Sequence, residues 1–357
     1  MKLTPFLQLT FDLFPEPTQP PPKVAGPDLR DYDKILVAFS GGKDSMACFL
    51  HVLEQLKAQG YTQAQIADTV ELWHHNIDGK EGSTLMDWPC TEDYCRKVAA
   101  LFDVPIYYSW RVGGFERELL KENAKIAPVR FEVPGGEVRE AGGKRGKIGT
   151  RRKFPQVSHD LRVRWCSPAL KIDVMAIAIN NQKRFRGKRS LVVTGERGEE
   201  GGRRASYQIF EPHRTDNRNS RSVQRHVDHW RPIRDWMESQ VWAIIEDYKL
   251  RVHPAYYLGF TRVSCMACIY MGANELASLY LLSPGKVDDI ADLEEEFGVT
   301  IKRKESIRQL LIKGKSFLAG TDQDREDAIS EIYTRNLILK KWIVPAGAMK
   351  GRSCGPT

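Results

Sequence analysis

The sequence predicts an α/β protein: a doubly wound parallel sheet of the Rossmann-like kind, with a C-terminal helical region. As far as about residue 235, short apolar runs of β type alternate with segments of helical period, as in parallel strands joined by crossover helices. Beyond Trp236 the apolar residues recur at helical spacing alone. In a sheet of this kind, ligands bind outside the carboxyl ends of the strands.

The first strand is expected at residues 34–39 (KILVAF), followed by a turn with two glycines and a helix over 44–57. By the same criteria we expect strands at 69–77, 105–110 and 191–194, and helices at 91–102, 170–180, 237–248, 273–282, 287–297 and 324–342. The chain then divides into a proline-rich extended lead-in (1–30), a nucleotide-binding α/β domain (31–235) and a mainly helical region (236–357).

Composition narrows the class of protein. Hydrophobic residues make up 41% and charged residues 28%, which is typical of a globular chain. Neither a long apolar run nor a secretory signal pattern is found, so we expect a cytoplasmic protein without a membrane partner. Seven cysteines in such a chain indicate thiol or metal chemistry rather than a disulfide framework.

The net charge of +8 is concentrated in two stretches. Residues 135–153 hold seven Lys or Arg against two Glu, and residues 211–234 hold six Arg against three acids. Localised positive charge fits a polyanionic partner such as nucleic acid, because phosphate neutralisation releases counterions. The alternative is a pair of solvated loops beside a nucleotide site.

The turn after the first strand is the strongest motif. It reads Ser40-Gly41-Gly42-Lys43-Asp44-Ser45 and opens the first helix. Backbone N–H groups at a helix start, two hydroxyls and a lysine ammonium form a cradle for phosphate. The spacing is not that of a Walker A loop.

This loop resembles the pyrophosphate loop of the adenine-nucleotide α-hydrolase superfamily, whose members split ATP between its α and β phosphates. Within that superfamily the chain is similar to the phosphoadenosine-phosphosulfate reductase branch. Four further motifs support the resemblance, in the branch's order: Arg164-Trp165-Cys166 with Leu170-Lys171; Gly195-Glu196-Arg197 with Glu200 and Arg204; Trp230-Arg231-Pro232-Ile233; and Tyr257-Leu258-Gly259 leading to Arg262-Val263-Ser264-Cys265 and Cys268.

The resemblance implies roles for particular residues. Catalysis falls to Ser40, Lys43, Asp44, Arg197 and Arg204. The nucleotide is expected on the loop from Ser40 through Gly41, Gly42, Lys43 and Asp44 to Ser45, together with Asp78 and Arg164. Mg²⁺ would accompany ATP, with Asp44 or Asp78 as its ligand. Gly201 departs from the branch's pattern, which has Ser there.

The cysteines suggest a sulfur-handling centre. Cys265 and Cys268 form a Cys-x-x-Cys, and Cys166 supplies a third thiolate, a ligand type that suits iron–sulfur clusters or zinc. Three readings stay open: an open [4Fe–4S] cluster that carries sulfur, a cluster completed by Cys90 or Cys95, and plain catalytic thiols. Cys48 is expected to be a packing residue, because it lies inside an amphipathic helix.

Two enzymatic functions follow. The first is an ATP pyrophosphatase that activates an acceptor for sulfur transfer, most similar to the ATP-hydrolysing component of DNA phosphorothioation systems, with a cysteine desulfurase as sulfur donor and DNA, or a DNA-handling protein, as partner. A tRNA thiolase would use the same loop. The second is a sulfonucleotide reductase whose nucleophile would be Cys354, although the tail lacks most of that family's motif. A nucleotide-sensing scaffold would not need Lys43, Asp44, Arg197 and Arg204 together.

Overall fold

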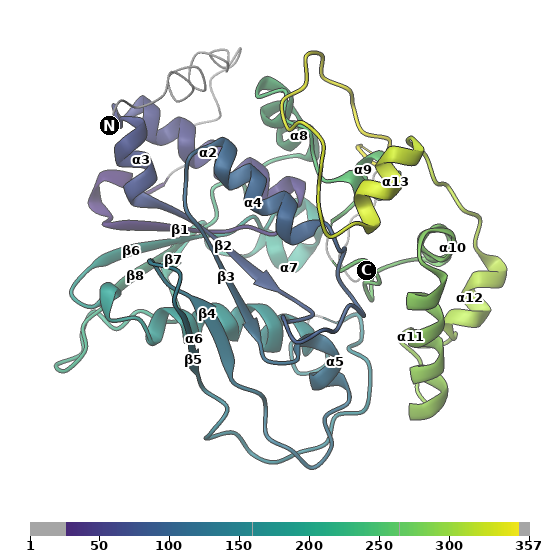
Figure 1. Cartoon of the computed structure of the whole chain (residues 1–357). Helices are drawn as coiled ribbons and strands as arrows, with labels where there is room; N and C mark the ends of the chain where they lie inside the picture. The colour runs from purple at the N-terminus through teal and green to yellow at the C-terminus, as the bar shows by residue number, and fades with distance from the viewer. Residues whose placement is uncertain (1–25, 159, 264, 350–357) are drawn as a thin grey trace.

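The computed structural model describes residues 26–158, 160–263 and 265–349, and its centre is an eight-stranded mixed sheet (Figure 1). Five strands are parallel neighbours, in the order β3-β2-β1-β6-β8, and the outer strands β4, β5 and β7 are antiparallel. The fold is therefore the predicted doubly wound α/β class, with antiparallel edges. The strands are β1 (Lys34–Ala38), β2 (Val70–Asn76), β3 (Ile106–Arg111), β4 (Val129–Glu132), β5 (Val138–Ala141), β6 (Arg189–Val193), β7 (Phe210–Pro212) and β8 (His226–Trp230).

Helices cover both faces of the sheet, and a helical group lies beside it (Figure 1). In the first part of the chain they are η1 (Leu29–Asp31), α2 (Lys43–Ala58), α3 (Gln63–Thr69), α4 (Thr91–Leu101), α5 (Gly114–Leu119), η2 (Pro168–Ile172), α6 (Asp173–Asn180), η3 (Lys183–Phe185), η4 (Gly198–Glu200) and α7 (Gly202–Ala205). The later helices are α8 (Glu238–Asp247), α9 (Pro254–Tyr257), α10 (Ala273–Leu282), α11 (Pro284–Phe297), α12 (Ile307–Lys313) and α13 (Asp322–Ile329).

Alternation along the central strand sorts its side chains into two cores. Ile35 and Val37 of β1 point to the large core, and Leu36 between them points to the smaller core on the opposite face. The large core includes α2, α4 and α8, whereas the smaller one is closed by α6. Buried on both faces, β1 reads as a continuous apolar run, as parallel strands do.

The large core continues across the predicted boundary at residues 235/236. It contains Leu29 and Ile35 as well as Val241 of α8, Leu279 of α10 and Ala348. The change at this point is therefore one of secondary structure, and the helical region shares its interior with the α/β part. Most of the predicted lead-in lies outside the described residues, but Leu29, which belongs to it, is buried in this core.

Two expectations about secondary structure are corrected. Four strands were not predicted, among them β8. Its sequence, HVDHW, mixes apolar residues with charged and polar ones and so lacks an apolar run. The predicted helix over 324–342 is wrong beyond Ile329, where α13 ends. The chain that follows pairs with residues after α8, where Ile338 forms a β-bridge with Leu250 and the Leu339 N–H bonds to the Lys249 carbonyl at 2.9 Å.

None of the helices in the described ranges is long and apolar enough to cross a bilayer.

Acid should weaken this fold, partly because of His51 in α2. The side chain is buried against Trp230 and Trp236, and burial lowers its pKa from 6.5 to about 4. The unfolded chain takes up this proton first as the pH falls, so stability present above about pH 6.5 is lost towards pH 4, on the order of 2–3 kcal/mol for this group. Urea unfolding at several pH values should show this loss. The free energy of unfolding should depend less steeply on pH in His51→Gln than in wild type. An unchanged slope would contradict the assignment.

Candidate functional site

The loop predicted to bind phosphate lies at the carboxyl edge of the sheet, where strand order reverses. From β1 the sheet runs through β2 to β3 on one side and through β6 to β8 on the other. Open α/β sheets bind ligands at this switch point. The segment after β6 comes so close to the start of α2 that a Cβ on Gly195 would lie 2.9 Å from the Asp44 carbonyl oxygen. Glycine at 195 therefore lets the two loops meet.

Within the loop, hydroxyl and backbone groups hold each other. Gly41 has a φ of +77°, a conformation that favours glycine. The Ser40 and Ser45 hydroxyl oxygens are 3.2 Å apart, and the Ser45 hydroxyl donates to the Gly42 carbonyl at 2.9 Å. The Ser40 N–H donates to Ser45 Oγ at 3.2 Å. The loop is thus preorganised at the positive end of a 16-residue helix.

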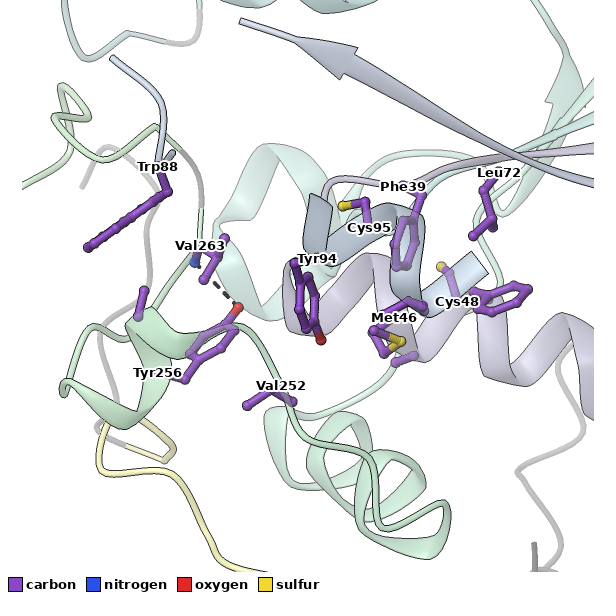
Figure 2. Packing of buried hydrophobic residues seen from close by; sticks show 14 of the residues in the cluster. Phe39, Met46, Cys48, Leu72, Trp88, Tyr94, Cys95, Val252, Tyr256 and Val263 are labelled. Atoms are coloured by element: carbon purple, nitrogen blue, oxygen red, sulfur yellow. Dashed lines mark hydrogen bonds between the residues drawn. The ribbon is translucent and has the colours of Figure 1, made fainter. Parts of the chain in front are cut away.

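A tyrosine from the helical region completes the loop, and sequence reasoning missed it. The Tyr256 hydroxyl accepts the backbone N–H of Lys43 at 2.9 Å and that of Val263 at 3.3 Å. Figure 2 shows the second of these bonds within the buried cluster that also contains Tyr94. Tyr256 immediately precedes the Tyr257-Leu258-Gly259 motif, which was the available signal.

Lys43 is buried among acidic groups. Its ammonium lies 3.4 Å from an Asp44 carboxylate oxygen, 3.8 Å from one of Glu238 and 3.4 Å from the Thr261 carbonyl. Burial opposes its charge, but Tyr256, Asp44 and Glu238 outweigh that effect and raise the pKa of Lys43. The lysine is therefore a fixed positive charge at the loop.

Arg197 contacts the loop through Asp44. Its guanidinium is 3% exposed, bonds to Asp44 Oδ1 at 2.5 Å and also pairs with Glu199. Burial opposes its charge, and the two carboxylates more than compensate, so the pKa of Arg197 is raised. With both partners in place, Arg197 orients Asp44. This geometry favours a positioning role over the predicted direct contact with pyrophosphate.

Arg204 belongs to an arginine cluster with Arg164 and Arg262. Burial lowers the pKa of Arg204, and the charges of Arg262 and Arg164 lower it further against the opposing effect of Glu196. Arg204 pairs with Glu200. Arg164 donates to the Tyr270 hydroxyl at 2.7 Å, and the Arg262 guanidinium lies 4.9 Å from the centre of the same ring. Guanidinium groups gathered in this way have the charge and the donors that suit a polyanion.

Asp78 follows β2 at the expected edge of the sheet, but its carboxylate is bonded to backbone groups. Its side chain is buried, its Oδ2 accepts the backbone N–H groups of Met86 and Asp87 at 2.9 and 2.8 Å, and its Oδ1 is 3.1 Å from the Met86 nitrogen. These bonds anchor the segment after β2. Asp78 is therefore not part of the proposed nucleotide or Mg²⁺ site.

The three predicted thiols lie near one another. Burial raises the pKa of Cys166 and the nearby Cys268 raises it further, while Lys171 opposes this. Burial also raises the pKa of Cys265 well above its usual value, against the effect of Lys171 and with further contributions from Cys268 and Cys166. In the described part of the chain, no three His, Cys, Asp or Glu side chains are grouped so that they could hold a metal ion. The cluster remains a prediction.

The remaining cysteines have separate surroundings. Cys90 Sγ is 3.2 Å from His253 Nε2 in the core, and Cys95 lies beneath the phosphate loop, where a Cβ on Gly41 would be 3.0 Å from its sulfur. These contacts favour packing roles over completion of a cluster. Cys48 is fully buried in α2, as expected (Figure 2). Cys354 lies outside the described residues.

The two basic stretches differ in how much of their charge is offset. In the second, Arg214 pairs with Asp173, Arg218 with Asp216 and Asp228, Arg231 with Glu196 and Glu211, and Arg234 with Asp235. In the first, Arg139, Arg151 and Arg152 are also paired with carboxylates, but Lys144, Arg145 and Lys147 are exposed and have no ion pair among the described residues. Residues 135–153 are therefore the better candidate for contact with a polyanion.

Comparison with known proteins agrees with these motifs over part of the chain. Residues 140–271 match the family model described as phosphoadenosine phosphosulfate reductase domain, which is less than half of the chain. An uncharacterized 37.8 kDa protein of Escherichia phage 186 is 28% identical over 154 residues, and the match spans 43% of each chain. The family match covers the predicted motifs from Arg164 to Cys268 and does not include the loop at residues 40–45.

Solved structures resemble this one only distantly. Phosphoadenylyl-sulfate reductase from Candida auris is 16% identical, with a TM-score of 0.34 over 66% of this chain and 83% of that one. FMN adenylyltransferase from Candida glabrata, in complex with FMN and an ATP analogue, is 12% identical, with a TM-score of 0.35 over 65% and 55%. The chain thus spans about half the length of the phage protein and of the adenylyltransferase, and scores this low carry no functional argument.

Proposed function

We propose that this enzyme cleaves ATP to AMP and pyrophosphate and thereby activates an acceptor for sulfur transfer. One observation carries the proposal: the segment from Tyr256 to Cys268 contacts the phosphate loop and also carries two of the thiols. Its Tyr256 hydroxyl is bonded to the Lys43 N–H, its Arg262 belongs to the arginine cluster, and Cys265 and Cys268 follow directly. A nucleotide on the loop would therefore lie beside the sulfur-handling residues.

The loop would bind the phosphates through backbone N–H groups and the Ser40 and Ser45 hydroxyls. Lys43 would meet charge on the departing pyrophosphate, and Arg204 and Arg164 would hold a neighbouring phosphate, as preorganised positive groups do in nucleotidyl transfer. Asp44 offers the carboxylate that fits Mg²⁺, since its side chain reaches the surface of the loop while Arg197 orients it. When bound, Mg²⁺ neutralises phosphate charge.

The proposed sulfur step uses thiols alone. An acceptor oxygen attacks the α-phosphorus of ATP, and pyrophosphate leaves. Sulfur arrives as a persulfide on one cysteine, attacks the activated atom and displaces AMP, while a second cysteine takes over the S–S bond. The resulting disulfide needs an external thiol reductant.

The finer assignment rests on the sequence motifs. We propose DNA phosphorothioation, with a cysteine desulfurase as donor and the exposed basic residues 144–147 as a contact for the DNA backbone. tRNA thiolation would use the same site. The family match over 140–271 favours a second candidate, reduction of phosphoadenosine phosphosulfate.

Product analysis tests the proposal. Purified enzyme with Mg·ATP should release AMP and pyrophosphate in equal amounts. Ser40→Ala should slow this release because a hydroxyl that donates a hydrogen bond to phosphate is lost. Formation of ADP and phosphate instead would contradict it. Thiol-dependent release of sulfite from phosphoadenosine phosphosulfate, lost in Cys354→Ser, would establish the reductase.

A further inference from the structure

A basic pocket opens next to the Cys-x-x-Cys segment, and it shares Tyr270 with the arginine cluster. Its volume is about 440 Å³, and its lining includes Tyr270, Met271, Lys302, Arg303 and Lys304. Leu310 of α12 forms part of its apolar wall. Small-molecule sites commonly have volumes of about 300–1,000 Å³ and combine apolar walls with a few polar groups.

The charge of this pocket is strongly one-sided. Three consecutive cations face it, and the acidic member of the lining, Glu305, is bonded to Lys313. Arg303 and Lys304 are exposed, so their charges are available to a ligand from solvent. Adjacent cations around a pocket of this size favour a compact anion, and a phosphate group has both the charge and the acceptor oxygens.

The pocket is continuous with the proposed reaction site. Tyr270, part of its wall, also binds Arg164 through its hydroxyl and faces Arg262 with its ring. Lys302 donates to the carbonyl of Ile269, the residue after Cys268. The Met271 N–H bonds to the Cys268 carbonyl at 2.9 Å, so the turn that carries Cys268 forms one edge of the pocket.

The first basic stretch leads to the same place. Arg152 pairs with Glu296 at the end of α11, and the Gln156 side chain donates to the Thr300 carbonyl at 2.9 Å. Thr300 lies two residues before Lys302. The segment at the end of the first basic stretch therefore packs against the chain that leads to Lys302–Lys304.

We infer that this pocket binds a phosphate ester the size of one nucleotide, with its phosphate over Arg303 and Lys304 and its remainder directed towards Cys268. Phosphate binding here does not depend on ATP cleavage. That the ligand is the sulfur acceptor rests on the proposed function. A free mononucleotide and one unit of a longer strand share this chemistry.

Calorimetric titration would test the pocket. The probes are thymidine 5′-monophosphate and a twelve-residue oligodeoxythymidine, each added with the phosphate loop saturated by a non-hydrolysable ATP analogue. Both should bind to wild type, and Arg303→Glu with Lys304→Glu should weaken binding about tenfold or more, because like charge then faces the phosphate. The matched control is Lys340→Glu with Lys341→Glu, which reverses two exposed charges elsewhere and should change binding less than about twofold.

The outcomes separate the ligand sources. Binding of the mononucleotide that is lost in the pocket variant indicates a small phosphate ester, and binding of the oligonucleotide alone, lost in the same variant, indicates a unit of a strand. Equal binding by the pocket and control variants, or no binding of either probe at millimolar concentration, would overturn the inference. Because the titration requires no turnover, failure of ATP cleavage would leave this result intact. A circular dichroism spectrum shows whether each variant is folded.

Discussion

Lys43→Ala is expected to lower the rate of ATP cleavage by about 10²–10³-fold, the effect of removing one preorganised charge from a transition state. The ammonium is held beside Asp44, Glu238 and the Thr261 carbonyl, so its position at the loop is fixed before any nucleotide binds. If Lys43 meets charge that develops on the leaving pyrophosphate, kcat should fall much more than ATP affinity does. Single-turnover kinetics and an ATP binding titration would measure the two effects.

The control lies on the same helix. Lys57→Ala removes a lysine from the other end of α2 and should leave the cleavage rate within about twofold of wild type, because this end is remote from the loop. An equal loss of kcat and of ATP affinity in Lys43→Ala would assign the lysine to binding alone. A normal cleavage rate would remove it from the mechanism.

Arg111→Ala should destabilise the protein by about 3–5 kcal/mol, as removal of one partner from a buried charged network does. Arg111 ends β3 and is 1% exposed; its Nε donates to the Ala169 carbonyl at 2.6 Å and its Nη1 to the Ala127 carbonyl. Burial lowers its pKa, and Glu118 opposes that effect. Without the guanidinium, two buried carbonyls lose their donor and Glu118 loses a counter-charge.

Urea unfolding would measure this loss, with Arg117→Ala as control. Arg117 is an exposed arginine of the neighbouring helix α5, and its removal should cost less than about 0.5 kcal/mol. If both variants unfold at the same urea concentration, Arg111 does not hold β3 to the segments around Ala127 and Ala169.

The sequence predicted the centre of this fold because local signals coincide there. Residues 35–39 are apolar throughout, glycines follow, and a helical period begins at once, so strand, loop and helix are all marked within about twenty residues. The same signals are absent at β8, where Asp228 sits among the strand's apolar residues. That carboxylate is buried because Tyr32 donates to it at 2.8 Å and Arg218 pairs with it, and these partners come from other parts of the chain.

Residue types in the site were predictable, but their partners were not. Composition indicates that Arg197 and Arg204 carry charge for an anion, yet the sequence does not reveal that Arg197 is closed between Asp44 and Glu199 while Arg204 faces other arginines. Asp78 likewise follows a strand at the expected edge, and only the fold shows that it binds the backbone of the next segment. The charge of a side chain can be read from the sequence, whereas its availability to a ligand depends on neighbours that only the fold shows.

The bond between Lys43 and Tyr256 has a consequence for biosynthesis. The two residues are 213 positions apart, so the phosphate loop leaves the ribosome long before the hydroxyl that completes it exists. Chains are synthesised at about 5–20 residues per second, which leaves the loop without this partner for some 10–40 seconds. During translation the emerging chain therefore lacks the finished loop, which is completed only when the segment that leads to Cys265 has been made.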